Sequence, residues 1–436
     1  MKKYFWAVFA AVSVCIVSGF TVSCSYHNGD DQVVHPDNPD PEPDPVPEPL
    51  PDEYLRALAF PNAYMVKPGS VIVIPVMKTY AVWAMYGEVL GEKLSRKATL
   101  SASLLWQDSP GLVTDISLTK DEIEQSEITV SLADGKQGNA IVAFKLDGII
   151  CWSWHIWATG YDPDAELVQQ GKTYEWDNNG DGVTDYVFMD RNLGALSDGT
   201  LLTRADSLAA CGLLYQWGRK DPFPGSAELR SDPKSGRPDY NSRAIYDQDG
   251  NVLEDTGMLP GSGIYALHLS EDLTQHNLYK TITRPMTLLI PDGRNGDTDY
   301  KEWYLISKDD QITDNALWAT DSGKGVFDPC PAGWRVPPYK NKLDPWKDFN
   351  NATSPYSTLG VFPYTGVRDV LSYPTVATLS RAGRATCIWS STPNSTRYVG
   401  EEIDYGNTRP CYGNGFVIGS LSTCKSMAAS VRCSKE

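Results

Sequence analysis

A short aspartate-rich stretch has the residue types and the spacing of a cation site. Between Asp177 and Asp185, oxygen-bearing side chains occupy positions 1, 3, 5 and 9, which are Asp177, Asn179, Asp181 and Asp185. Glycine stands at position 6. Ca²⁺ binds about six to eight oxygens, which a tight loop of alternating polar residues can supply. We therefore predict Ca²⁺ as a structural cofactor on these four residues.

The same stretch also has a simpler interpretation. Only its first half matches an EF-hand loop, because position 12 is Phe188 and not Glu. A polar turn between two short strands would explain the Asn-Gly and Asp-Gly pairs without an ion. Three aspartates in a small volume would repel one another in such a turn, and the spacing is similar to that of calcium-binding extracellular repeats. Both features favour the cation.

Patterns for nucleophilic or metal-assisted catalysis are absent from the sequence. It contains no Gly-x-Ser-x-Gly, no His-Glu-x-x-His and no P-loop. Outside the first 35 residues its histidines are isolated, and a histidine in a strand, such as His155, is more often packed than catalytic. Glu401 and Glu402 are adjacent, so on a strand they would face opposite ways. The sequence therefore predicts a protein that is not an enzyme.

The segment from Asp328 to Pro337 must be irregular. Its repeated prolines fix φ and remove backbone donors, so no regular helix or strand can run through all of it. Side chains and cross-links must hold such a segment in place. Cys330 is a natural tether, and Trp334 is a large apolar side chain that can anchor the segment on a core.

The cysteines predict cross-links. Seven of the nine lie beyond Cys24, and no Cys-x-x-Cys pair exists, which argues against a zinc cluster or a thioredoxin-like centre. We prefer a disulfide between Cys330 and Cys433, which would tie the irregular segment to the last strand. A pair between Cys411 and Cys424 is a weaker alternative. The odd number of cysteines leaves at least one thiol unpaired.

The first 24 residues are typical of an export signal. Lys2 and Lys3 are followed by an apolar run that is shorter than the about 20 residues of a spanning helix. Small residues then precede Cys24, as in bacterial lipoprotein signals, although Thr21 replaces the usual leucine. We predict that Cys24 is lipidated and anchors the chain to a membrane. Ordinary cleavage is the alternative.

Residues 25–55 are predicted to form a stalk. Prolines alternate with Asp and Glu between Pro36 and Pro51, and such a stretch cannot bury enough apolar surface to fold. The stalk would lift the folded part away from the membrane, although a generic spacer is the other interpretation.

The net charge of the whole chain, −17, argues against nucleic acid as a partner.

Residues 56–160 are predicted to form an Ig-like β-sandwich. Short alternating runs at 71–74, 100–106 and 127–132 are typical of strands. The clearest signal is a hairpin from Ala140 to Trp157, with a two-residue turn at Asp147 and Gly148. No helical pattern of comparable strength occurs here. The next domain begins near residue 161.

Five motifs in residues 161–436 resemble one known family. They are Val187–Ala195, Gly212–Phe223, Asp328–Pro337, Trp389–Thr392 and Ser430–Cys433. In this order they are similar to the Fibrobacter succinogenes major paralogous domain of Bacteroidetes surface lipoproteins. The resemblance implies a C-type-lectin-like α+β fold. Arginines recur in the motifs, and we expect Arg191, Arg219 and Arg335 to pair with nearby aspartates. No Glu-Pro-Asn or Gln-Pro-Asp sugar signature is present.

Within the same region we expect a helix over about 205–217, long loops over about 225–300 and short strands from residue 359 onward. The whole fold is thus predicted to be mainly β with minor α. Long loops are where ligands are met in C-type-lectin-like folds.

Together these features predict a non-enzymatic lipoprotein on the outer membrane and cell surface. Its C-type-lectin-like domain would serve adhesion, or bind a glycan or a cell-surface protein, on the cell or within a fimbria-like assembly. Two alternatives stay open. One is an enzyme on a fold like that of formylglycine-generating enzymes, although no matching cysteine arrangement is evident. The other is a purely structural envelope protein.

Overall fold

The computed structural model describes most of the chain after residue 48. It leaves out residues 1–48, 92–93, 120–122, 166–172, 178, 202, 228–241, 254, 258–263, 269–274, 291–302, 305–315, 321–322, 340–344, 347–355, 358–359, 369–378, 381, 384, 399–400, 413–420 and 424. Cys24 and the predicted stalk up to residue 48 therefore lie outside the described residues. Residues from Leu50 to Glu436 form one compact unit.

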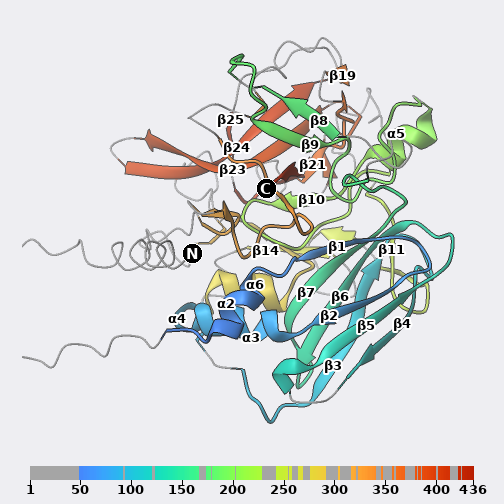
Figure 1. Cartoon of the computed structure of the whole chain (residues 1–436), viewed down its shortest axis with the longest axis vertical. Coiled ribbons are helices and arrows are strands. Elements are labelled where there is room, and N and C mark those ends of the chain that lie inside the picture. The colour runs from blue at the N-terminus through green and yellow to red at the C-terminus, as the bar shows by residue number, and fades with distance from the viewer. Residues whose placement is uncertain are drawn as a thin grey trace, which may run out of the picture. The chain divides into compact units, whose positions relative to one another are not determined.

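The described residues are arranged mainly as β-structure with few helices (Figure 1). The α-helices are α2 (Asp52–Leu58), α3 (Met77–Met85), α4 (Gly87–Leu90), α5 (Arg204–Ala210) and α6 (Asn277–Thr283). A 3₁₀ turn covers Ile123–Gln125. The expected class, mainly β with minor α, is thus confirmed. Among the described residues, no helix has the length and apolar character needed to span a bilayer.

Two sheets are built mainly from the first half of the chain, and the larger of them also contains two short strands from residues 245–253. The larger has the order β1 (Ala63–Val66), β7 (Ile149–Ala158), β6 (Gly138–Leu146), β3 (Leu100–Gln107), β11 (Ile245–Tyr246) and β12 (Val252–Leu253). The smaller has the order β2 (Val71–Pro75), β5 (Glu127–Leu132) and β4 (Val113–Leu118). Every pairing is antiparallel except that of β1 with β7. The two sheets lie against each other in the lower part of Figure 1.

The hairpin β6–β7 forms as its sequence predicts. Asp147 and Gly148 both have positive φ, at 48° and 83°. This is the conformation of a type I′ turn, whose twist matches that of the two strands. Asp147 also accepts a hydrogen bond from the Thr99 N–H through Oδ1, at 2.8 Å. The turn therefore sets the register of the first pairs next to it, and the pairing shifts between Lys145 and Phe144.

The remaining strands build further sheets, mainly from the second half of the chain. The largest has the order β22 (Leu379–Ser380), β21 (Val367–Arg368), β26 (Ala428–Ser430), β23 (Ala385–Tyr398), β24 (Glu401–Tyr412) and β25 (Leu421–Thr423), and β10 (Leu214–Gln216) pairs with β26. Another has the order β18 (Trp334–Arg335), β27 (Ser434–Lys435), β9 (Tyr186–Met189) and β8 (Thr173–Trp176). The last strand of the chain is therefore held between two earlier ones.

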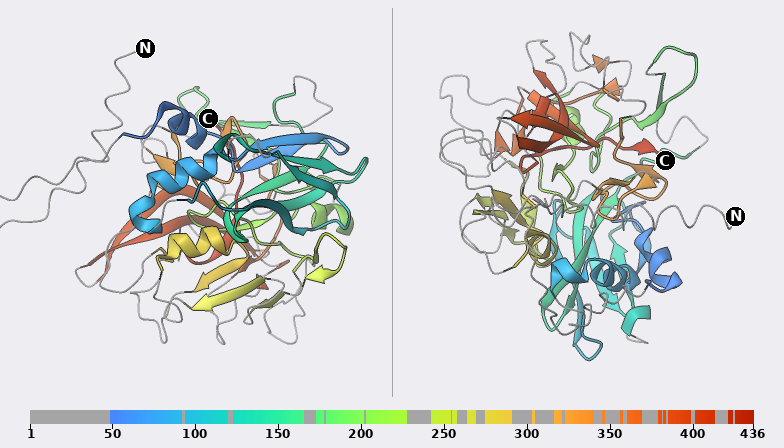
Figure 2. Two further views of the ribbon diagram at one scale, coloured as in Figure 1. Left: turned by 90° about the horizontal axis from the view of Figure 1, so that it is seen from below. Right: turned by 90° about the vertical axis from the view of Figure 1, so that its left-hand side faces the viewer.

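Short ribbons complete the second half. They are β13 (Asp255–Gly257), β14 (Ile264–His268) and β15 (Thr287–Ile290) in one parallel sheet, β16 (Ala319–Thr320) with β17 (Gly323–Lys324), and β19 (Tyr356–Ser357) with β20 (Gly360–Val361). The left view in Figure 2 shows the yellow strands of the parallel sheet next to α6.

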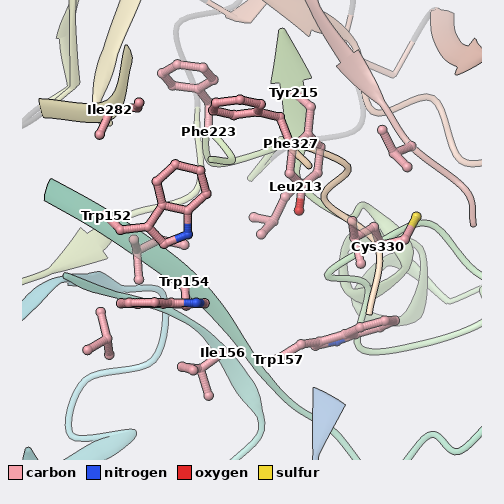
Figure 3. Close-up of a cluster of buried hydrophobic side chains, with 14 of the residues drawn as sticks. Trp152, Trp154, Ile156, Trp157, Leu213, Tyr215, Phe223, Ile282, Phe327 and Cys330 are labelled. Atoms are coloured by element: carbon pink, nitrogen blue, oxygen red, sulfur yellow. The ribbon is translucent and has the colours of Figure 1, made fainter. Parts of the chain in front are cut away.

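One hydrophobic core runs through both halves. β7 is buried along most of its length, including Trp152, Trp154 and Trp157. Figure 3 shows these indoles beside side chains from the second half, among them Phe327. The rings of Trp152 and Phe327 lie 5.3 Å apart between centroids. The predicted boundary near residue 160 thus falls within a continuous core.

Three local expectations were wrong. Residues 56–160 are not purely β, because α2, α3 and α4 lie at or within this range. Nearly all of α3 is buried, so its sequence shows no polar face that would reveal a helix. The helix expected over 205–217 ends at Ala210, and β10 follows. The expected loops over 225–300 contain β11–β15 and α6.

Candidate functional site

The aspartate-rich loop connects β8 to β9 on the surface. The carboxylate of Asp177 turns back into the loop. Its Oδ1 accepts a hydrogen bond from the Gly180 N–H and its Oδ2 accepts one from the Gly182 N–H, both at 2.7 Å. These bonds hold the pKa of Asp177 below its ordinary value, and the bond from Gly182 has the largest effect. The carboxylate is therefore kept charged inside a turn of backbone donors.

Two further predicted ligands are bonded to the same turn. Oδ1 of Asp181 accepts a hydrogen bond from the Val183 N–H at 2.8 Å, and Oδ2 accepts one from Asn179 Nδ2 at 3.0 Å. Asp185 donates its backbone N–H to the Trp176 carbonyl at 2.8 Å, which closes the hairpin. Across the described part of the chain, no three acidic, histidine or cysteine side chains gather in a metal-binding group. Each carboxylate has about four acceptor positions, so these bonds leave capacity for a cation.

The irregular segment from Asp328 to Pro337 is buried and cross-linked. The structure contains the predicted disulfide between Cys330 and Cys433, with Cα atoms 6.0 Å apart. Trp334 is buried, and its Nε1 donates to Asp164 Oδ2 at 3.1 Å. Lys435 donates to Oδ1 of the same aspartate at 3.0 Å. The segment is thus tied to the last strand by a covalent bond and by a shared acceptor.

Asp328 organises the backbone of this segment. Its Oδ1 accepts from the Cys330 N–H and its Oδ2 accepts from the Val336 N–H, both at 2.8 Å. The side chain is fully buried. Burial raises the pKa of Asp328 to about 6, although Lys324 and the two N–H donors act in the opposite direction. One carboxyl group therefore replaces the hydrogen-bond ladder that the prolines prevent.

Lys324 closes the other side of the segment. Its Nζ donates to the carbonyls of Cys330 at 2.6 Å, Pro331 at 2.9 Å and Trp334 at 2.5 Å. It also lies 3.8 Å from Asp328 Oδ1. Burial is the main cause that lowers the pKa of Lys324. An ammonium group with three carbonyl acceptors serves as a clamp on irregular backbone.

The same segment contacts the first half of the chain. Asn62 Nδ2 donates to the carbonyls of Val326 at 2.8 Å and Asp328 at 2.9 Å. The next residue, Ala63, forms an isolated parallel bridge with Pro331. The start of β1 and the irregular segment are therefore joined by side-chain hydrogen bonds to main-chain carbonyls and by this bridge. The segment is a joint between the two halves.

A buried ion pair lies nearby in the same joint. Lys220 Nζ is 2.8 Å from Oδ1 and 2.7 Å from Oδ2 of Asp221. It also donates to Ser153 Oγ at 2.6 Å, and that hydroxyl donates to Asp221 Oδ1 at 2.6 Å. The ammonium lies 4.4 Å from the centre of the Trp152 ring. Burial lowers the pKa of Lys220 to about 8. The side chains of Ser153, Lys220 and Asp221 therefore provide hydrogen-bond partners for one another.

The hollow beside this cluster is small. It has essentially no free volume even for a molecule the size of water, and it is lined by Arg219, Lys220, Asp221, Thr281, Ile282 and Phe327. Small-molecule sites usually enclose roughly 300–1,000 Å³. The serine and lysine therefore have no space beside them for a substrate of ordinary size.

The arginines of the motifs have different partners. Arg191 pairs with Asp190 at 2.6 and 3.1 Å, as predicted. Arg219 instead donates to Gln216 Oε1 and to the carbonyls of Thr287 and Pro285. Arg335 donates to the Gly323 carbonyl at 3.0 Å. The expected pairing with an aspartate was wrong for Arg219 and Arg335, because their hydrogen bonds go to main-chain carbonyls and, for Arg219, also to the Gln216 amide.

The five motifs are bonded to one another. Trp217 Nε1 donates to the Ser390 carbonyl at 2.9 Å, and Trp389 Nε1 donates to the Tyr215 carbonyl at 2.7 Å. These two bonds join the second and fourth motifs. Backbone bonds join the first motif to the second and the fifth, through Leu193 with Leu213 and with Val431. The disulfide joins the third to the fifth. The motifs form one buried scaffold.

Cys151 and Cys211 are buried thiols. Burial raises the pKa of Cys151 to about 11 and that of Cys211 to about 12. Such thiols are poor nucleophiles at neutral pH. The weaker predicted pair, Cys411 with Cys424, lies outside the residues whose side chains are described.

Sequence reasoning missed Asn62, Lys220 and Lys324 as organising residues. Lys220 had a signal, since it precedes Asp221 within a motif. Asn62 and Lys324 had no such signal, because their acceptors are carbonyls from distant or irregular segments.

Compared with known proteins, the chain matches no family model, no curated protein and no solved structure.

Proposed function

We propose that this protein is a non-enzymatic, lipid-anchored surface protein that presents a binding domain for adhesion. The observation that carries the proposal is the bonded scaffold of the five motifs. Their buried titratable groups, such as Asp221 and Asp328, are engaged in internal bonds. Residues that hold a fold leave ligand binding to the loops around it. The ligand is a glycan or a cell-surface protein.

Export is supported by the disulfide and by the start of the chain. Structural disulfides persist in oxidising compartments and are rare in the cytosol. The apolar run before Cys24 and the acidic, proline-rich residues after it suit a lipid anchor and a stalk at the outer membrane. The test is mass analysis of the mature protein without reduction. Expected are a lipid on Cys24 and a peptide pair joined through Cys330 and Cys433, and an unmodified cysteine would contradict the anchor.

The finer fold assignment is part of the proposal. In an Ig constant domain one sheet has strands C, F and G, and the other has A, B, E and D. Here β3, β6 and β7 occupy the first order, and β2, β5 and β4 occupy the places of B, E and D. This supports an Ig-like sandwich. For the second half, a C-type-lectin-like domain is supported by the five ordered motifs and by the last strand, which lies between β9 and β18.

Calcium in the aspartate-rich loop is also part of the proposal. Asp177, Asn179, Asp181 and Asp185 would supply the oxygens, and the ion would stabilise the β8–β9 hairpin. Terbium luminescence with the chain from Ser25 onward tests this. We expect saturable binding that Ca²⁺ displaces and that Asp181→Ala abolishes. Binding that is unchanged in this variant would contradict the site.

Binding itself is tested with the same chain from Ser25 onward on glycan and cell-surface protein arrays. The expected result is reproducible binding that survives in Cys151→Ala, a variant of a buried thiol. Copper-dependent oxidation of a thiol substrate would favour an enzyme instead. A folded protein that binds nothing on either array would favour a structural envelope role.

A further inference from the structure

The smaller sheet of the first half has one edge that is protected and one that is not. β4 forms the protected edge. The Val113 N–H donates to Gln107 Oε1 at 3.0 Å, and the Val113 carbonyl accepts from Gln248 Nε2 at 3.3 Å. A register shift and the exposed Asp115 follow directly. Capped backbone groups, bulges and charges are the usual means by which an edge avoids further pairing.

β2 forms the other edge and has none of these features along its first four residues. Among the described residues, β5 is its sole strand partner. Its exposed side chains are Val71, at 61% exposure, and Val73, at 48%. No charged residue occurs in the ten residues from Pro68 to Met77. An exposed, β-branched and uncharged edge is suited to pairing with another strand.

The register shows which backbone groups of β2 point outward. The Leu132 N–H donates to the Ser70 carbonyl, and the Val76 N–H donates to the Ser126 carbonyl. Hydrogen-bonded pairs alternate along an antiparallel ladder, so residues 70, 72, 74 and 76 face β5. The N–H and C=O groups of Val71 and Val73 therefore face away from it. The same two residues supply the open backbone groups and the exposed side chains.

The position beside β2 is where an Ig constant domain places its first strand. Here the first strand, β1, pairs in parallel with β7 in the opposite sheet. Helix α2 precedes it. The described chain therefore leaves the place next to β2 open to an antiparallel strand. Strand addition at such an edge draws its affinity from main-chain hydrogen bonds.

We propose that β2 pairs with β2 of a second copy of this chain. A twofold axis at Ile72 aligns Val71 of one copy with Val73 of the other, twice. Each such pair can exchange two main-chain hydrogen bonds. The chain carries a net charge of −17, so self-association needs a contact without like charges, and the uncharged segment 68–77 supplies one. A different extended partner would need its own complementary strand.

The pairing is a weak one. An edge-to-edge contact of five-residue strands buries less than the roughly 1,200 Å² of a standard stable interface. The dimer therefore forms and dissociates with concentration. It depends neither on the lipid anchor nor on the ligand of the second half.

The decisive variant is Val73→Pro. The Val73 N–H points away from β5, so proline removes one outward donor and leaves the β5 ladder intact. Val73→Thr is the matched control, since it keeps the β-branched shape and the N–H. Sedimentation velocity over a concentration series, with the chain from Ser25 onward, reports the dimer. Thermal unfolding of each variant confirms that it is folded.

We expect a concentration-dependent dimer for the wild type and for Val73→Thr. The dimer of Val73→Pro should dissociate about tenfold more readily or more, since two hydrogen bonds are lost per dimer. A wild type that stays monomeric overturns the proposal, even if it takes up another extended peptide. A dimer that Val73→Pro leaves unchanged also overturns it.

Discussion

Two irregular segments of this protein use the same device in opposite surroundings. The loop from Asp177 to Asp185 is exposed, and the segment from Asp328 to Pro337 is buried for the most part. In each, one aspartate accepts several backbone N–H bonds and so holds a turn. The pKa of Asp177 is lowered, whereas the pKa of Asp328 is raised to about 6. Burial alone reverses the direction, because the hydrogen bonds are alike.

The difference also decides what each segment contributes. The exposed loop holds only itself and the hairpin that it closes. The buried segment joins Asn62, Cys433 and Lys324 from three other parts of the chain. Changes in the buried segment should therefore affect the whole unit, and changes in the exposed loop should remain local.

The largest effect should come from the disulfide. The double variant Cys330→Ala and Cys433→Ala should lose roughly 4–5 kcal/mol of unfolding free energy, because the bridge closes a loop of 103 residues. Urea unfolding of the oxidised wild type and of the variant measures this. Wild type treated with a reductant should match the variant. An unchanged midpoint would show that the bridge does not hold the segment.

Breaking the buried ion pair should cost nearly as much. In Asp221→Ala the Lys220 ammonium stays buried with only Ser153 as a partner, and the expected loss is about 3–4 kcal/mol. Adding Lys220→Met should restore part of this loss, since no buried charge then remains. Urea unfolding of both variants gives the comparison. A double variant less stable than the single one would contradict this account.

Asp328 should give the buried segment a pH dependence. Its pKa in the folded protein, about 6, lies above the ordinary 3.8. The folded chain then binds more protons than the unfolded chain between these values, so stability falls as the pH rises from about 4 to about 6. The loss reaches about 3 kcal/mol at most. Asp328→Asn removes this titration, and the stability difference between wild type and variant should change across the window. A stability difference between wild type and variant that stays constant from pH 4 to pH 6 would contradict the raised pKa of Asp328.

The exposed loop should give the smallest effect. Without calcium, Asp181→Ala removes surface hydrogen bonds to Val183 and Asn179, and the expected loss is below about 1 kcal/mol. With Ca²⁺ the wild type should melt at a higher temperature and the variant should not. Calorimetry with Ca²⁺ and with a chelator measures both. A large loss in the variant without calcium would mean that the loop contributes to the core.

Much of the fold follows from local pattern. The β6–β7 hairpin was predictable because alternating apolar residues flank an Asp-Gly turn. The disulfide was predictable because a proline-rich segment needs a tether, and Cys330 lies within it. By contrast, α3 was missed, since its residues from Lys78 to Trp83 are all buried and its apolar residues show no helical period.

The aspartate-rich loop was predictable as a turn between two strands, and its four oxygen-bearing residues all belong to the connection between β8 and β9. Among the described residues their carboxylates do not gather in a metal-binding group. The joint was only partly predictable. The Arg191–Asp190 pair is local in sequence, whereas Arg219 depends on carbonyls at residues 285 and 287. Every residue has a main-chain carbonyl, so the sequence does not show which side chain will bind a particular one.

By itself, the sequence determined the elements whose causes are local: many of the strands, the turns and the segment that no hydrogen-bond ladder can hold. Only the tertiary structure decided which charges are buried and what satisfies them. Lys220 and Asp328 are ordinary surface residue types until the two halves pack together and exclude water. Burial is a property of the packed chain, so it sets their pKa values and their partners beyond the reach of any local pattern.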